Sequence, residues 1–96
     1  MAEYRLTPTA ERDLENIWLY TRQQWSTEQA DLYIEILANA FAELAQAPKT
    51  APGCDHIRNG YRRLSVVRHM IYFRVTHFGI TIVRILHDRM DAPRHL

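Results

Sequence analysis

The segment VRILHDRMD, residues 83–91, joins a run of apolar residues to a cluster of titratable and cationic side chains. Branched aliphatic residues favour a buried strand, and His87, Asp88, Arg89 and Asp91 follow where that strand would end. A strand fixes the positions of its last side chains and its end exposes them, which is one way to build an active site. The same pattern also ends an ordinary structural strand. The segment therefore predicts either a site for chemistry or a surface that holds a partner.

One chemistry open to these residues is cleavage of an RNA phosphodiester. That reaction needs a group to activate the ribose 2′-OH, a proton donor for the leaving oxygen, and cations on the phosphate. His87 could be the acid or base, with Arg62 and Arg84 as phosphate contacts. Against this, Asp88 and Asp91 lie beside the histidine, where their charges would repel a phosphate. Catalysis and partner binding both stay open on the residues alone.

The charges are distributed unevenly along the 96 residues. Residues 1–57 carry four Lys or Arg against nine Asp or Glu, a net charge of −5, whereas residues 58–96 carry eight Arg against two Asp, a net charge of +6. Guanidinium groups form forked contacts with carboxylates and phosphates, so the basic half suits either nucleic acid or an acidic protein segment. Acidic helices packed on a basic sheet would give the same distribution, and composition does not separate these readings.

Length and cysteine content limit the class of protein. A chain of 96 residues that is 47% hydrophobic fits one domain, 1–96, with one core. The single cysteine, Cys54, has no partner for an intramolecular disulfide, and the His and Cys residues lack metal-ligand spacing, so we expect neither a metal nor a cofactor. No stretch is apolar enough for a signal peptide or a membrane span, which predicts a cytoplasmic protein without a membrane partner.

Two helices are predicted in the first half of the chain. Thr7 is a good N-cap and a proline follows it, so a first helix with an apolar stripe should span residues 8–24. Ser26 begins a capping box, and the apolar period of the second helix runs to Ala47, where Pro48 ends it. With so short a connection, the two helices should form an antiparallel hairpin.

Strands are predicted before and after the helical hairpin. The expected strands are residues 4–6, 61–67, 69–76 and 80–86, with a loop over 48–60 and turns near Val67-Arg68 and at 77–79. The order is β-α-α-β-β-β. The predicted fold class is therefore α+β, an antiparallel sheet with the N-terminal helical hairpin packed on one face.

This order of elements, together with three sequence blocks, resembles the RelE/ParE toxin superfamily of bacterial toxin–antitoxin modules, and most closely ParE. The blocks are YRLT at residues 4–7, CDHIRNGYR at 54–62, and IVRILH at 82–87 followed by Met90-Asp91. Further matching residues lie between the blocks, so the resemblance covers nearly the whole chain: Ala10, Asp13, Leu14, Ile17, Tyr20, Trp25, His69, Ile71, Tyr72, Phe73 and Arg74. Each block is weak by itself, and their order and spacing make the combination specific.

The resemblance implies a toxin of a type II toxin–antitoxin system that inhibits DNA gyrase and blocks replication. It implies an inhibitor and not an enzyme, without direct sequence-specific binding to nucleic acid. A ParD-like antitoxin, which is a ribbon-helix-helix DNA-binding protein, would neutralise it. Two alternatives stay open: a ribosome-dependent mRNA interferase of the RelE type, because the fold hosts both activities, and an inactive homologue that only binds antitoxin.

Binding to the target or the antitoxin is predicted to use the arginine-rich half. The candidate residues are Arg58, Tyr61, Arg62, Arg74, Arg84, Arg89 and Met90. An apolar helical hairpin beside a basic sheet offers a groove for an amphipathic helix and an edge for an added strand. An acidic antitoxin segment would meet the +6 half favourably.

Structural roles compete with these functional ones. Arg58 with Asp55 could form an ion pair that braces the loop. Strict alternation would point Arg84 away from the helices. We expect Trp18 and Trp25 to pack in the core or at the end of the helical hairpin. His87 could tie the strand end to a backbone group or to Asp91.

Overall fold

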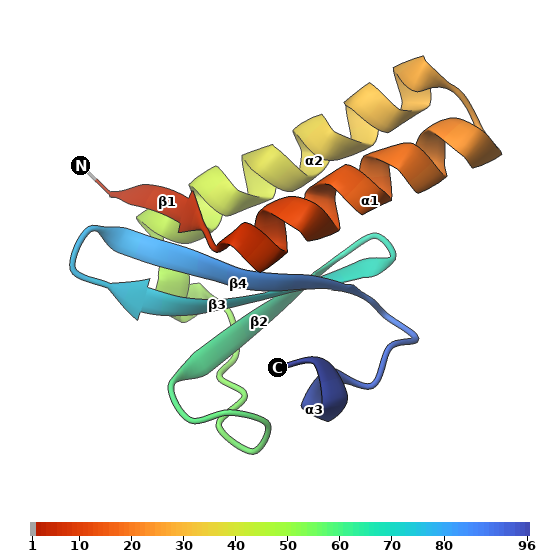
Figure 1. Cartoon of the computed structure of the whole chain (residues 1–96). Coiled ribbons are helices and arrows are strands. Elements are labelled where there is room, and N and C mark those ends of the chain that lie inside the picture. The colour runs from red at the N-terminus through yellow and green to blue at the C-terminus, as the bar shows by residue number, and fades with distance from the viewer. Residues whose placement is uncertain (1) are drawn as a thin grey trace.

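The computed structural model describes residues 2–96, which form four strands and two long helices with a short helix near the C-terminus (Figure 1). The elements are β1 (Glu3–Leu6), α1 (Pro8–Gln24), α2 (Thr27–Gln46), the 3-10 helix η1 (Pro48–Thr50), β2 (Tyr61–Val66), β3 (His69–Thr76), β4 (Gly79–His87) and α3 (Ala92–His95). The predicted α+β class and the predicted order of the long elements are confirmed.

The sheet has the order β1-β4-β3-β2. Strands β2, β3 and β4 form an antiparallel meander, as predicted, whereas β1 pairs with β4 in parallel. The predicted wholly antiparallel sheet was therefore wrong at this edge, because no local signal specifies which strand the first segment joins. Gly79 permits the pairing: its φ is +146°, and a Cβ there would collide with the backbone of Glu3.

Local signals set the helix ends. The Thr7 hydroxyl accepts a hydrogen bond from the Ala10 amide at 3.0 Å, and the Ser26 hydroxyl accepts one from the Gln29 amide at 3.0 Å. The first helix has the predicted bounds, and the second ends at Gln46, one residue before the predicted end. The two helices lie side by side across one face of the sheet (Figure 1).

The turn between β2 and β3 contains neither glycine nor proline, and it lies at its predicted place. Val67 and Arg68 connect β2 to β3, and Val67 adopts a φ of 54°, which closes the hairpin with two residues. The next turn uses His77 and Phe78, and Gly79 already belongs to β4.

Apolar side chains form two clusters on opposite faces of the sheet. The larger one lies between the sheet and the two long helices and includes Phe41, Phe73 and Ile82. The smaller one lies on the other face, where the C-terminal segment with α3 covers Tyr72 and Cys54. No helix of residues 2–96 combines the length and apolarity that crossing a membrane requires.

Strand β4 contains a bulge at Val83, which has no partner in the register with β3. Ile82 and Ile85 therefore both contact the core under the helices, although they are three positions apart. The expectation that Arg84 points away from the helices is wrong, because its guanidinium group reaches Asp13 on α1.

Candidate functional site

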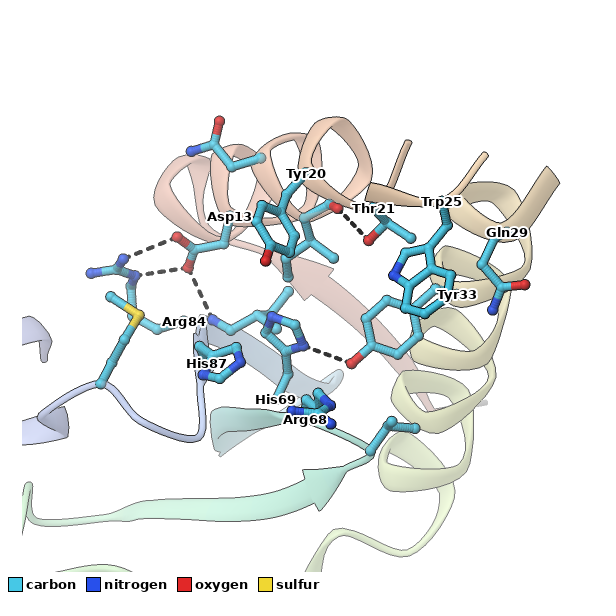
Figure 2. A pocket seen from close by; sticks show the side chains of 15 residues that line it. Asp13, Tyr20, Thr21, Trp25, Gln29, Tyr33, Arg68, His69, Arg84 and His87 are labelled. Carbon is cyan, nitrogen blue, oxygen red and sulfur yellow. Dashed lines mark hydrogen bonds and ion pairs between the residues drawn. The ribbon is translucent and has the colours of Figure 1, made fainter. Parts of the chain in front are cut away.

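A groove of about 560 Å³ lies between the helical hairpin and the end of the sheet where β3 begins and β4 ends (Figure 2). We call it the hairpin groove. It is lined by Asp13, Tyr20 and Trp25 from α1 and its C-cap, by Tyr33 from α2, by Val67 and Arg68 from the β2–β3 turn, by His69 from β3, and by Arg84, His87 and Met90.

The rim of the hairpin groove exposes large apolar side chains. Trp25 is 77% exposed, Val67 70% and Tyr20 64%. The expectation that Trp25 packs in the core or at the hairpin end is wrong, because this residue caps α1 and its ring lies open at the groove. Trp18, in contrast, is partly buried and donates a hydrogen bond from its indole N–H to Asp31 at 2.8 Å. Clustered exposed aromatic residues in a groove are typical of protein-binding sites.

One wall of the groove contains a polar contact between α2 and β3. The Tyr33 hydroxyl lies 2.6 Å from His69 Nδ1, and the His69 and His87 rings meet edge to face at 5.4 Å (Figure 2). Burial, followed by the nearby His87, lowers the pKa of His69. Burial also raises the pKa of Tyr33. Both shifts favour the neutral forms, so the wall of the groove carries no charge at these two residues near neutral pH.

An ion pair in the groove joins α1 to β4. The Asp13 carboxylate accepts hydrogen bonds from Arg84 Nε at 2.8 Å and Nη2 at 2.9 Å, and from the Ile85 amide at 2.9 Å. This hydrogen bonding to Asp13 raises the pKa of Arg84. Arg84 also donates from Nη1 to the carbonyl of His95 at 2.8 Å. Its guanidinium group therefore ties the groove to the C-terminal segment.

His87 acts as a brace for the strand end. Its Nδ1 accepts from the Arg89 amide at 3.2 Å when the proton of the neutral ring is on Nε2, and lies 2.9 Å from an Asp88 oxygen, to which a protonated Nδ1 would donate. The two contacts therefore need different protonation of Nδ1. The backbone contact agrees with expectation, but the neighbouring carboxylate is Asp88 and not Asp91, which lies 3.7 Å from Arg94.

The other predicted binding residues lie away from the groove, apart from Met90, which lines it, and the exposed Arg89 just before it. Arg62 donates to the Ala51 carbonyl at 2.7 Å, and Arg74 is exposed on β3.

The guanidinium group of Arg58 lies 6.0 Å from the Tyr61 ring centroid and donates to the Leu96 carbonyl at 2.6 Å. The expected ion pair of Arg58 with Asp55 is not formed, because Asp55 accepts from the Gly60 amide at 2.8 Å.

The three residues considered for RNA cleavage do not converge. His87 pairs in register with His69 at one end of β3, whereas Arg62 pairs with Phe73, four positions along the strand. Four residues of strand correspond to about 13 Å. The guanidinium group of Arg84 is already engaged by Asp13.

Sequence reasoning missed Asp13, Tyr20, Tyr33 and His69 as groove residues. Asp13 and Tyr20 lie on the predicted amphipathic helix, and only the tertiary structure shows what they face. One usable signal was Tyr20 itself, a large aromatic residue outside the apolar stripe of its helix.

Comparison with known proteins shows which family this chain belongs to. The family model described as "ParE toxin of type II toxin-antitoxin system, parDE" matches residues 4–92. The chain belongs to the ParE toxin family. Toxin ParE1 of Mycobacterium tuberculosis is 43% identical over 96 residues, which cover 99% of this chain and 98% of that relative.

Two further comparisons extend the match. Toxin ParE1 of Caulobacter vibrioides is 36% identical and is covered over 99% of its length. The fold of this ParE toxin also matches a chain of the chromosomal ParDE system from P. aeruginosa, with a TM-score of 0.79 and 24% identity over 91% of this chain and 96% of that one. The predicted ParE resemblance is therefore confirmed, and the protein is a toxin of a ParDE type II toxin–antitoxin system.

Proposed function

We propose that this ParE toxin inhibits DNA gyrase and is neutralised by a ParD-like antitoxin whose amphipathic segment occupies the hairpin groove. The observation that carries the antitoxin part is the cluster of exposed aromatic and apolar side chains at one groove. Trp25, Tyr20 and Val67 are each more than half exposed, although residues of this size usually bury most of their surface. A partner that covers them would gain the apolar contacts that dominate protein interfaces.

The shape and charge of the groove favour an amphipathic helix with acidic flanks. Such a helix presents apolar residues at three- and four-residue spacing, which suits a trough between a helical hairpin and a sheet end. Arg68 lines the groove and Arg89 is exposed near Met90 at its edge. These cations would orient acidic residues of the partner and accelerate association.

Gyrase as the target is inferred from family membership together with the arrangement of the basic residues. The candidate nuclease residues lie at different places on the sheet, with Arg62 held by the Ala51 carbonyl and Arg84 held by Asp13. Acid–base cleavage of RNA needs such groups around one phosphate. Inhibition by binding needs only a complementary surface, so the gyrase proposal fits these residues better than the mRNA interferase does.

A supercoiling and cleavage assay tests the proposal. Purified gyrase, relaxed plasmid, ATP and the toxin are combined with and without antitoxin. We expect supercoiling to stop and linear DNA to accumulate, and the antitoxin to reverse both effects. A toxin that binds antitoxin but leaves gyrase unaffected would contradict the proposal. Cleavage of ribosome-bound mRNA by that same sample would then identify the interferase, and no activity in either assay would identify an inactive antitoxin-binding homologue.

A further inference from the structure

We propose that the face of the sheet turned away from α1 and α2 binds the phosphate backbone of duplex DNA, chiefly through Arg63 and Arg74. We call this surface the open sheet face; it carries Arg5, Tyr61, Arg63, Tyr72, Arg74 and Thr81. The inference rests on the proposed function, because a gyrase inhibitor works beside the DNA that gyrase holds. It adds a second surface and a second ligand to that function.

Strand register brings the arginines to one face. Arg5 of β1 pairs with Thr81 of β4, Thr81 with Arg74 of β3, and Arg74 with Tyr61 of β2, so one row crosses all four strands. Side chains that pair across neighbouring strands lie on the same face. Arg63, two positions after Tyr61, lies on this face as well and is a diagonal neighbour of Arg74, with a separation of about 7 Å. The two guanidinium groups can therefore reach neighbouring phosphates of one DNA strand.

Two of these cations are free to take an anionic partner. Within residues 2–96, no carboxylate forms an ion pair with Arg63 or Arg74, and Arg74 is exposed. Arg5, in contrast, is paired with Glu3 at 2.6 Å. Unpaired arginines on a surface supply the sequence-independent attraction that dominates DNA binding.

The aromatic residues of this face favour a duplex over an unpaired strand. Tyr72 is only 3% exposed, and Tyr61 is half-buried, with the Arg58 guanidinium group 6.0 Å from its ring centroid. Single-stranded nucleic acid is usually bound by bases stacked on open aromatic rings. A buried ring and a half-buried ring offer little surface for stacking, which leaves phosphate contacts, and a duplex offers these in a regular row.

Charge-neutralising variants test the inference on the full chain without gyrase. We would measure binding to a short fluorescein-labelled duplex by anisotropy over a range of salt concentrations, for the wild type and for Arg63→Gln/Arg74→Gln. Losing two phosphate contacts should weaken binding and reduce the slope of log K against log salt by about 1.8. Arg12→Gln/Arg22→Gln, which removes the same charge from exposed positions on α1, is the matched control and should keep the wild-type slope.

A charge-conserving variant and a measurement of antitoxin binding keep the result interpretable. Arg63→Lys/Arg74→Lys retains both charges and should retain the slope, and all variants should bind antitoxin as the wild type does. Absence of salt-dependent duplex binding, equal losses in the control, or tighter binding to single-stranded RNA or an acidic peptide would overturn the inference. The gyrase assay is read separately: a toxin that traps gyrase without binding DNA would overturn this inference alone, and one that binds DNA without affecting gyrase would overturn only the proposed function.

Discussion

The hairpin groove and the open sheet face lie on opposite sides of one β-sheet and differ in chemistry. The groove exposes apolar rings; Tyr33 and His69 in its wall are neutral, and Asp13 is paired with Arg84. The open face has buried or half-buried tyrosine rings and carries Arg63 and Arg74, which form no ion pair within residues 2–96. The difference shows how a small toxin gains two binding surfaces: apolar contacts give affinity for a protein segment, and free cations give attraction for an anion.

One residue connects the two sides. Arg84 donates to Asp13 in the groove and to the His95 carbonyl in the C-terminal segment, which covers Tyr72 and the second apolar cluster. Substitutions can therefore separate the two surfaces or break this connection.

The largest expected effect comes from removing Asp13. In Asp13→Ala, Arg84 and the Ile85 amide lose their acceptor. The side chains of Arg84 and Asp13 are only 19% and 12% exposed. Loss of one partner from such a buried pair costs about 3–5 kcal/mol of unfolding free energy. Urea denaturation measures the change.

The matched control for this variant is Glu3→Gln. Its pair with Arg5 is 52% and 63% exposed, so the loss should be about 0–1 kcal/mol. Equal losses in the two variants would mean that the Asp13 contact does not connect α1 to the sheet in solution.

The next effect belongs to the groove alone. Trp25→Ala removes the most exposed aromatic ring of the groove rim, and we expect antitoxin to bind about 30-fold more weakly, equivalent to about 2 kcal/mol. Calorimetric titration with antitoxin measures it. Leu19→Ala removes an exposed apolar side chain of α1 outside the groove and should bind like the wild type. If Leu19→Ala weakened binding as much, the antitoxin would cover the outer surface of α1 instead.

Removal of residues 91–96 should affect the open face more than the groove. The deletion breaks the hydrogen bonds of Arg58 to Leu96 and of Arg84 to His95 and uncovers Tyr72. We expect unfolding free energy to fall by about 1–3 kcal/mol, since each hydrogen bond contributes about 0.5–1.5 kcal/mol. Gyrase inhibition should weaken while antitoxin binding is kept. Full inhibition by a destabilised deletion protein would limit the segment to a structural role.

A smaller effect should appear with pH. The pKa of His69 is lowered in the folded protein by burial and by His87, so the unfolded chain binds a proton more readily. Stability should therefore be fully present above the ordinary histidine pKa and should be lost as pH falls below it. His69→Gln should flatten this part of the stability–pH curve. An unchanged curve would assign the loss to other groups.

Much of the fold could be predicted from local signals. Thr7, Ser26 and Pro48 mark helix ends by their own hydrogen bonding or by a missing donor, so the helix bounds followed directly. The Val67-Arg68 turn is predictable because a single strand over residues 61–76 would be too long for so small a domain.

Tertiary features were not predictable in the same way. The bulge at Val83 reverses the alternation of β4, and the contact of Asp13 with Ile85 joins residues 72 positions apart. Trp25 continues an apolar spacing, but its helix ends there and leaves it exposed. The charge count located the basic half, but it did not show that Arg84 is paired with Asp13 while Arg74 forms no ion pair in the described part of the chain, residues 2–96.

A gyrase cleavage assay titrated with antitoxin tests the account most directly, using the wild type and Trp25→Ala side by side. We predict that both proteins make gyrase accumulate linear DNA, and that antitoxin suppresses the wild type at a concentration about 30-fold lower than the variant, as expected for one lost hot-spot residue. No linear DNA from the wild type, or identical antitoxin titrations for the two proteins, would contradict the account.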